Sequence, residues 1–210
     1  MVEPGSRLDR AFFDRPTADV AIGLISTVLW RVTPEGVTSG RIVETEAYLD
    51  AADRASHAAW SKRGQDVMKR APGTIYIYRS YGMHWMLNIV AHAPEAVGAV
   101  LIRAVEPLEG LELMEQRRRT TDIRQLCSGP GKLCQAFAID EAMHKVDLTT
   151  SHEIWITPGR SHGEIDIAVG ERIGITKSPE LPLRFFEVGS RFVSAHRRGV
   201  PLKPEMLPSS

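Results

Sequence analysis

Two carboxylates and a tyrosine alternate along one strand-like stretch of the sequence. Residues 40–48 read Gly-Arg-Ile-Val-Glu-Thr-Glu-Ala-Tyr, and the polar run Asp-Ala-Ala-Asp begins at residue 50. The β-branched centre and the ends of this stretch are typical of a β-strand. Side chains on a strand alternate between its faces, so Glu44, Glu46 and Tyr48 share one face. That face suits the wall of a pocket, although on the strand alone a solvated face of a half-exposed sheet is the commoner explanation.

Polar residues elsewhere in the chain are candidates for the same pocket or for an anion site. Asn88 interrupts an apolar run, so if buried it must bind neighbouring backbone or a polar ligand. Arg103 ends a fully apolar run, and it either reaches the surface or holds an anion. Lys132 follows Ser-Gly-Pro-Gly at a predicted helix start, where backbone N–H groups favour an anion, although an ordinary loop-to-helix junction fits as well. The arginines at 117–119 suit phosphates, but the dipole of a helix also explains their place.

The first third of the chain must position the alternating carboxylates. Apolar spacing predicts a helix over 14–29, although 27–32 fits a strand as well. A turn at Pro-Glu-Gly then makes 27–48 a hairpin. Residues 50–72 have little periodicity, which predicts an irregular surface excursion that carries His57, and a histidine in a loop is usually just solvated.

The rest of the chain predicts mostly strands. Two of them, 75–80 and 83–90, are separated by a turn or bulge at Tyr81-Gly82. A strand over 96–105 and a helix over 108–119 follow. Further strands are predicted at 154–156, 165–167, 172–175, 183–186 and 191–194, and the proline-containing tail at 199–210 is expected to be loosely ordered.

Composition limits the class of protein. With 210 residues, 43% hydrophobic and 25% charged, the chain is expected to form one domain over 1–210, with its core at about 11–195. Lys+Arg and Asp+Glu are equal at 26, which weakens a claim of nucleic-acid binding without excluding a local basic patch. No apolar run is long enough for a membrane span, and the N-terminus is unlike a signal peptide, so we expect a cytoplasmic protein.

Neither the cysteines nor the histidines predict a metal site. Cys127 and Cys134 lack a zinc spacing and fit buried thiols in a reducing compartment. His144, His152 and His162 are irregularly spaced, and no H-E-x-x-H motif occurs.

Several short motifs agree in order and spacing with one known family. They are Glu44-Thr-Glu-Ala-Tyr48, His57, Pro72-Gly73, Tyr76-Ile-Tyr78, Tyr81-Gly-Met83, Asn88, Leu101-Ile-Arg-Ala104, Glu106-Pro107, Gly129-Pro130, Lys132-Leu133 and Pro182-Leu-Arg-Phe185. With these motifs the chain, from about residue 11 to residue 194, resembles the methylpurine (3-methyladenine) DNA glycosylase family of the alkyladenine type. The resemblance implies a mixed α/β (α+β) fold, a single domain around a curved, largely antiparallel sheet with a protruding β-hairpin.

The resemblance also implies roles for the pocket residues. Glu46 corresponds to the general base that activates water. Tyr48, His57 and Tyr78 correspond to residues that enclose a flipped base. Arg103 corresponds to an arginine that lines the site near the target nucleotide's backbone.

Other positions correspond to contacts that read or hold the DNA. Tyr81 matches a hairpin-tip tyrosine that enters the minor groove and fills the gap left by the base. Asn88 matches a residue that disfavours guanine by crowding its exocyclic amine. Met83, beside Tyr81, and Lys132 are the remaining expected DNA contacts.

The chemistry of base excision fits these roles. A base inside a duplex cannot be reached, so the nucleotide must be extruded. Alkylated purines such as 3-methyladenine carry positive charge, which aromatic walls attract. Cleavage of the N-glycosidic bond passes through an oxocarbenium-like transition state, which a carboxylate stabilises while it takes the proton of water. The resemblance thus implies a monofunctional glycosylase that needs no cofactor, acts as a monomer on double-stranded DNA with damaged purines and leaves an abasic site.

Two other classes remain alternatives at this point. A damaged-DNA-binding module without catalysis would lack Glu46, which is present. A hydrolase of free purine nucleosides would need the pocket but not a wedge, and Tyr81-Gly82 and the arginines at 117–119 argue for a polymer. The chain departs from the family at Gly64-Gln65, where an Arg-Asn pair is usual, and at Lys69. The sequence therefore does not rank hypoxanthine, ethenoadenine, 3-methyladenine and 7-methylguanine as substrates.

Overall fold

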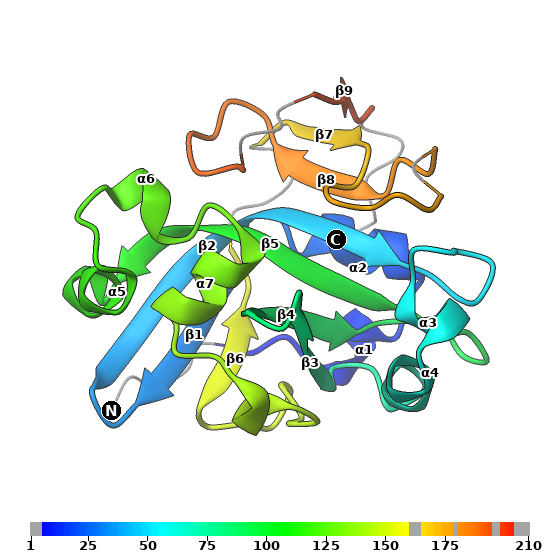
Figure 1. Cartoon of the computed structure of the whole chain (residues 1–210), viewed down its shortest axis with the longest axis horizontal. Coiled ribbons are helices and arrows are strands. Elements are labelled where there is room, and N and C mark those ends of the chain that lie inside the picture. Colours follow the sequence, from blue (N-terminus) through cyan, green and yellow to red (C-terminus); the bar gives the residue numbers. More distant parts are fainter. Residues whose placement is uncertain (1–5, 160–164, 179, 195–197, 204–210) are drawn as a thin grey trace.

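One open antiparallel sheet organises the molecule (Figure 1). The computed structural model describes residues 6–159, 165–178, 180–194 and 198–203. Within them the strands follow the order β3-β4-β5-β2-β8-β7-β9, and β1 pairs with β2 and β6. The strands are β1 (Val28–Thr33), β2 (Gly36–Tyr48), β3 (Ile75–Ser80), β4 (His84–Val90), β5 (Ala99–Glu109), β6 (Ile154–Thr157), β7 (Ile167–Gly170), β8 (Arg184–Glu187) and β9 (Val200–Pro201). This confirms the expected mixed α/β class with a large antiparallel sheet.

Short helices surround this sheet. They are α1 (Arg10–Phe13), α2 (Thr17–Gly23), α3 (His57–Trp60), α4 (Lys62–Met68), α5 (Leu111–Arg118), α6 (Ile123–Leu126), α7 (Pro130–Ala136) and the 3₁₀ turn η1 (Glu141–Met143). Both α2 and α7 pack against β5, α2 also against β2 and α7 also against β4. Figure 1 shows α7 in front of the central strands and α3 and α4 together at the end of β2. No helix in the described part of the chain is long and apolar enough to cross a membrane.

Strand β2 runs through the middle of the molecule and is covered on both faces. It pairs with β5 along one edge, and with β1 and then β8 along the other. Residues 42–47 are all fully buried, whichever face they point to. The alternative of a solvated face for Glu44 and Glu46 is therefore wrong. The register with β5 shifts on both sides of Glu44, which is a bulge that locally re-aims side chains.

The predicted helix over 14–29 is wrong in its second half. Helix α2 ends at Gly23, and β1 begins at Val28, so the alternative of a strand at 27–32 is confirmed together with the hairpin to β2. Ser26 has a φ of 79°, a left-handed conformation that breaks the helix between these elements. Apolar spacing alone could not separate a buried helix from the buried strand that continues it.

The predicted irregular excursion at 50–72 is also wrong, because it contains α3 and α4. Each helix begins at a serine cap: Ser56 accepts from the Ala58 N–H at 3.2 Å and Ser61 from the Gly64 N–H at 3.2 Å. The two helices pack mainly on each other. With four and seven residues they are too short to show an apolar period.

Several other boundaries differ from the predictions. Strand β5 continues to Glu109, and Gly110, with a φ of 73°, starts α5. The strands predicted at 172–175 and 191–194 are turns and irregular chain. In the predicted loose tail, Val200 and Pro201 pair with β7, while residues 204–210 lie outside the described part, as does His162. Both cysteines are buried free thiols, as predicted.

Candidate active site

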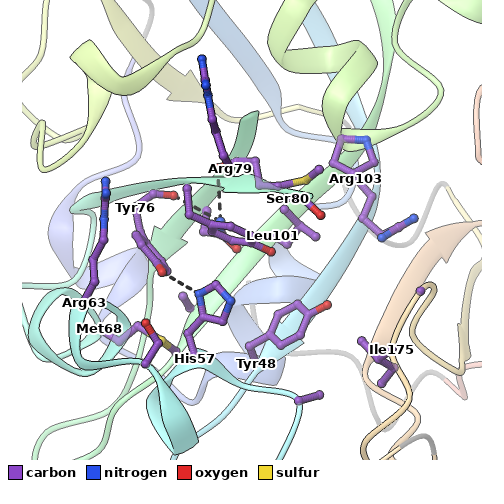
Figure 2. Close-up of a pocket in the computed structure, with 18 of the residues that line it drawn as sticks. Tyr48, His57, Arg63, Met68, Tyr76, Arg79, Ser80, Leu101, Arg103 and Ile175 are labelled. Atoms are coloured by element: carbon purple, nitrogen blue, oxygen red, sulfur yellow. Dashed lines mark hydrogen bonds between the residues drawn. The ribbon is translucent and has the colours of Figure 1, made fainter. Parts of the chain in front are cut away.

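A cavity of about 730 Å³ opens beside the end of β2 (Figure 2). Its walls come from β2, α3, β3, β4, β5 and residues 173–175. Figure 2 shows Tyr76, His57 and Tyr48 in a row along one wall, with Ile175 on the segment beyond Tyr48. The cavity has the size of a small-molecule site.

The wall is built from uncharged aromatic rings. The centroids of His57 and Tyr78 lie 4.3 Å apart, and those of Tyr76 and Tyr78 lie 5.5 Å apart. The Nδ1 atom of His57 lies 2.6 Å from the Tyr76 hydroxyl. Burial lowers the pKa of His57, raises that of Tyr76 and raises the pKa of Tyr78 to about 12. At neutral pH these rings therefore carry no charge, and aromatic rings of this kind attract a cationic ligand.

Glu46 lies directly behind this wall and is 0% exposed. Its Oε2 accepts from the Tyr48 hydroxyl at 2.8 Å and from Arg103 Nη1 at 3.2 Å. Its Oε1 accepts from the backbone N–H of Ile173 at 2.7 Å. All three donors belong to residues that line the cavity. Two carboxylate oxygens offer about four acceptor positions, so one position on Oε1 stays free.

The pKa of Glu46 reflects a conflict between burial and its partners. Burial raises the pKa of Glu46, and the charge of Glu44 acts in the same direction. Arg103, the Ile173 N–H and the Tyr48 hydroxyl each lower it, and the net result is a raised pKa. A raised pKa in a buried carboxyl beside a cavity is the usual preparation of a general base.

Arg103 lies between two buried carboxylates. Its Nη1 reaches Glu46, and its Nε lies 3.5 Å from Glu44 Oε1. Of the two alternatives for Arg103, the prediction that it reaches the surface is wrong. It holds anions, and these are the carboxylates of Glu44 and Glu46. It also lines the cavity, so the guanidinium links the ligand space to Glu46.

Glu44 lies beside Glu46 but belongs to a different set of contacts. It accepts from Arg184 Nη1 at 2.9 Å, from the Ser194 N–H at 2.9 Å and from the Ser194 hydroxyl at 2.8 Å. These bonds attach the chain after β8 to the central strand. Neither carboxylate lines the cavity. Glu46 binds three residues that do, whereas Arg103 is the one lining residue among the described partners of Glu44.

Asn88 is 3% exposed and lines the cavity. Its amide nitrogen donates to the carbonyl oxygens of Tyr76 at 3.2 Å and of Met86 at 3.3 Å. The backbone role weighed for this residue is confirmed. A contact between Asn88 and a ligand stays a prediction.

The tip of the β3–β4 hairpin presents two large apolar side chains to solvent at the mouth of the cavity. Tyr81 is 86% exposed and Met83 is 70% exposed. Tyr81 and Gly82 have φ values of 51° and 68°, the pair of left-handed conformations that a tight hairpin turn requires. Tyr81 also lines the cavity, so its ring can reach whatever stands at the entrance.

The basic residues expected at phosphates lie elsewhere or have partners. Lys132 Nζ donates to Gln125 Oε1 at 2.6 Å and lies 3.3 Å from Ser128 Oγ, and it does not line the cavity. Arg117 binds Glu35 at 2.6 Å and the Ala136 carbonyl at 2.9 Å. Arg118 donates to the Leu126 carbonyl at 3.0 Å. The described partners of the first two of these arginines join α5 to its neighbours, and contact of residues 117–119 with phosphates stays a prediction.

Sequence reasoning missed three residues that shape the site. Arg172 and Asp53 form a buried ion pair, 119 residues apart in sequence, next to the wall. Gly64 allows α4 to approach α3, since a Cβ atom there would lie 2.4 Å from the Cβ atom of His57. The departure from the family at Gly64 therefore places a helix against the cavity histidine. Among the described residues, no group of three or more His, Cys, Asp or Glu is placed to hold a metal ion.

Comparison with known proteins shows the family of the chain. The family model described as methylpurine-DNA glycosylase (MPG) matches residues 11–191. A protein of Chlorobaculum parvum is 45% identical over 94% of this chain and 95% of its own length. One of Rhodopseudomonas palustris is 46% identical over 90% and 91%, and one of Chlorobium luteolum 43% identical over 91% and 98%. All three carry the provisional name 3-methyladenine DNA glycosylase. The chain therefore belongs to the methylpurine-DNA glycosylase family.

Proposed function

We propose that this protein is a monofunctional DNA repair glycosylase that hydrolyses the N-glycosidic bond of alkylated or deaminated purines in double-stranded DNA. The observation that carries the proposal is the Glu46 carboxylate, buried behind an aromatic cavity and bonded to three of its lining residues. The family and the names of the relatives support the same activity. We also propose that the whole chain acts as one catalytic unit and works as a monomer.

The cavity is proposed to hold the damaged base after it leaves the duplex. We place the purine against the rings of Tyr48, His57 and Tyr78, which line the cavity, where a positively charged alkylpurine gains cation–π attraction. The lowered pKa of His57 favours its neutral form, so this ring does not repel a cationic base. Asn88 borders the same space and is proposed to crowd the exocyclic amine of guanine.

Glu46 is proposed to activate the water that attacks the sugar. As the glycosidic bond breaks, positive charge develops on the sugar ring, and a carboxylate held in a dry site stabilises it. The free acceptor position on Oε1 is the place for the water, whose proton Glu46 takes. Arg103 keeps enough of the carboxylate ionised to act as a base, against the effect of burial. The water oxygen then bonds to the sugar carbon, the base leaves with the bond electrons, and an abasic site remains.

Tyr81 is proposed to fill the gap in the duplex. It is the most exposed large apolar side chain among the described residues and stands at the cavity mouth. An inserted ring offsets part of the unstacking cost of a few kcal/mol. Met83 is proposed to contact DNA beside it. The exposed hairpin favours a DNA polymer over a free nucleoside as the substrate. A protein that acts on DNA is proposed to work wherever the cell keeps its DNA.

Single-turnover excision tests this function. Duplexes carrying 3-methyladenine, 7-methylguanine, hypoxanthine or ethenoadenine are each incubated with excess protein, and abasic sites are measured over time. We expect excision of at least one lesion, and unmodified duplex DNA should compete. Glu46→Gln should bind the lesion but excise it more slowly by a factor of about 10²–10⁴. Near-normal excision by Glu46→Gln would remove Glu46 from the role, and faster turnover of a free nucleoside would favour the nucleoside hydrolase.

A further inference from the structure

A buried ion pair with no assigned role lies beside residues that line the cavity and does not line the cavity itself. Arg172 Nη1 lies 2.6 Å from Asp53 Oδ2, and Arg172 Nη2 lies 2.8 Å from Asp53 Oδ1, a two-bond geometry in which both oxygens are used. The two side chains are 0% and 1% exposed. Removing two charges from water costs several kcal/mol per ion, so a buried pair is weak evidence for stability and calls for another explanation.

The pair fastens together two pieces of chain that have no regular pairing. Asp53 also accepts from the backbone N–H groups of Leu49 and Ala55, each at 3.1 Å, and so fixes the turn after β2. Arg172 Nη1 donates to the Ala47 carbonyl at 3.0 Å. The Arg172 guanidinium carbon also lies 4.8 Å from the centre of the Tyr48 ring. Arg172 is thus held from three sides by the end of β2 and the following turn.

The residue after Arg172 makes the contact that matters chemically. The Ile173 N–H donates to Glu46 Oε1 at 2.7 Å, and residues 173–175 line the cavity. We call residues 171–175 the strap. The strap has no strand pairing. Its first residue accepts a hydrogen bond from Arg184 Nε at 2.8 Å through the Glu171 carbonyl, and next to Ile173 it is anchored by Arg172.

We propose that Asp53 and Arg172 are positioning residues: their ion pair seats the strap so that the Ile173 N–H binds Glu46 and favours its ionised, base-competent form. The inference rests on the proposed function of Glu46 and extends it to two residues that touch neither substrate nor water. It also sets the place of the attacking water, because the free acceptor position on Oε1 lies beside the strap.

Every charged or titratable group that faces Glu46 enters the expected pH dependence. These groups are Arg103 from β5, Glu44 and Tyr48 from β2, Tyr78 from β3 and Arg172 from the strap. The Asp53→Asn change leaves all of them in the sequence. Removing the negative charge of Asp53 removes a repulsion between like charges, which by itself would lower the pKa of Glu46. Displacing the strap removes a hydrogen bond from the carboxylate, which raises the pKa of Glu46. The two effects on this pKa therefore have opposite signs.

The experiment compares the pH dependence of single-turnover excision in the wild type and Asp53→Asn. A hydrogen bond to a charged group is worth about one pH unit. The acidic limb of the pH–rate profile of Asp53→Asn should therefore move to a pH that is higher by roughly 1 unit. The ratio of the variant rate to the wild-type rate should accordingly rise about tenfold from the acidic to the alkaline side. Arg172→Lys, which keeps the charge but cannot bridge both oxygens, should shift the limb in the same direction.

A matched control separates positioning from loss of stability. Glu187→Gln breaks the Arg41–Glu187 pair, whose side chains are 11% and 13% exposed and which does not line the cavity. It should lower the Tm without moving the limb. An unmoved or lowered limb in both Asp53→Asn and Arg172→Lys, whatever their Tm, would overturn the proposal.

A second readout works without activity. The pKa of Glu46 can be followed by carboxyl ¹³C NMR, with the signal assigned by its absence in Glu46→Gln. If the wild type excises no lesion, the proposed function fails, and the NMR titration still decides whether Asp53→Asn raises the pKa of Glu46. If Glu46 has the same NMR pKa in Asp53→Asn and in Arg172→Lys as in the wild type, that result alone would overturn the positioning role.

Discussion

At the scale of single residues, the site depends on polar side chains that are buried and hydrogen-bonded to the protein. Asn88 is an example, because both of its described bonds go to backbone carbonyls while its side chain borders the cavity. A fixed amide makes a rigid steric gate. Asn88→Ser should open space for a 2-amino group and raise excision of undamaged guanine, relative to an alkylated adenine, by roughly tenfold or more. The measurement is the ratio of the two single-turnover rates, and an unchanged ratio with a lowered Tm would leave Asn88 a purely structural residue.

The residue types of the site were visible in the sequence, but their partners were not. Alternation placed Glu44 and Glu46 on one face, yet one binds the cavity wall and the other anchors Ser194 and Arg184. Local pattern does not encode contacts across more than a hundred residues, which is the separation of Asp53 and Arg172. An aspartate in a turn and an arginine after a strand look like ordinary surface residues until the fold buries them together.

At the scale of elements, the β3–β4 hairpin is the part that we propose enters the DNA. Tyr81→Ser removes the exposed ring and leaves the gap in a duplex unfilled, at a cost of a few kcal/mol. Lesion-specific binding should weaken and excision from a matched duplex should slow. The loss should be smaller for a lesion opposite a mismatch or in single-stranded DNA, where extrusion is already easier. The matched control is Val200→Ser, an exposed apolar residue at the far edge of the sheet. If Tyr81→Ser slows all these substrates alike and lowers the Tm, the ring is packing rather than a wedge.

Strands were predicted better than helices for a physical reason. Strands β3 and β4 carry alternating or continuous apolar runs with a clear turn between them, so pattern and structure agree. Helices α3 and α4 hold a few residues each and are defined by serine caps and by their contact with one another. Without an apolar period, 50–72 looked irregular. That segment carries His57 and Gly64. Because the two helices were not predicted, their support of the cavity wall was not predicted either.

At the scale of the whole molecule, a base-competent carboxylate is held at the expense of stability. Burial raises the pKa of Glu46 above its ordinary value of 4.5. The folded protein therefore binds this proton more tightly than the unfolded chain. The stability that results is fully present below the unfolded pKa and is lost as pH rises through the folded pKa. At neutral pH the fold thus carries a strained charge that serves the proposed chemistry, a trade of stability for activity.

Glu46→Gln tests this trade, because its amide stays neutral at every pH. The Tm of Glu46→Gln minus that of the wild type should increase as pH rises from about 5 to about 8, by roughly 2–4 °C for each kcal/mol of buried-charge cost. Differential scanning calorimetry across that range measures the offset, and the change with pH matters more than its value at one pH. Glu112→Gln on the exposed side of α5 is the control, and its offset should stay small. An offset for Glu46→Gln that is flat or falls with pH would mean that Arg103, Tyr48 and the strap fully compensate the buried charge, and that the site is not strained.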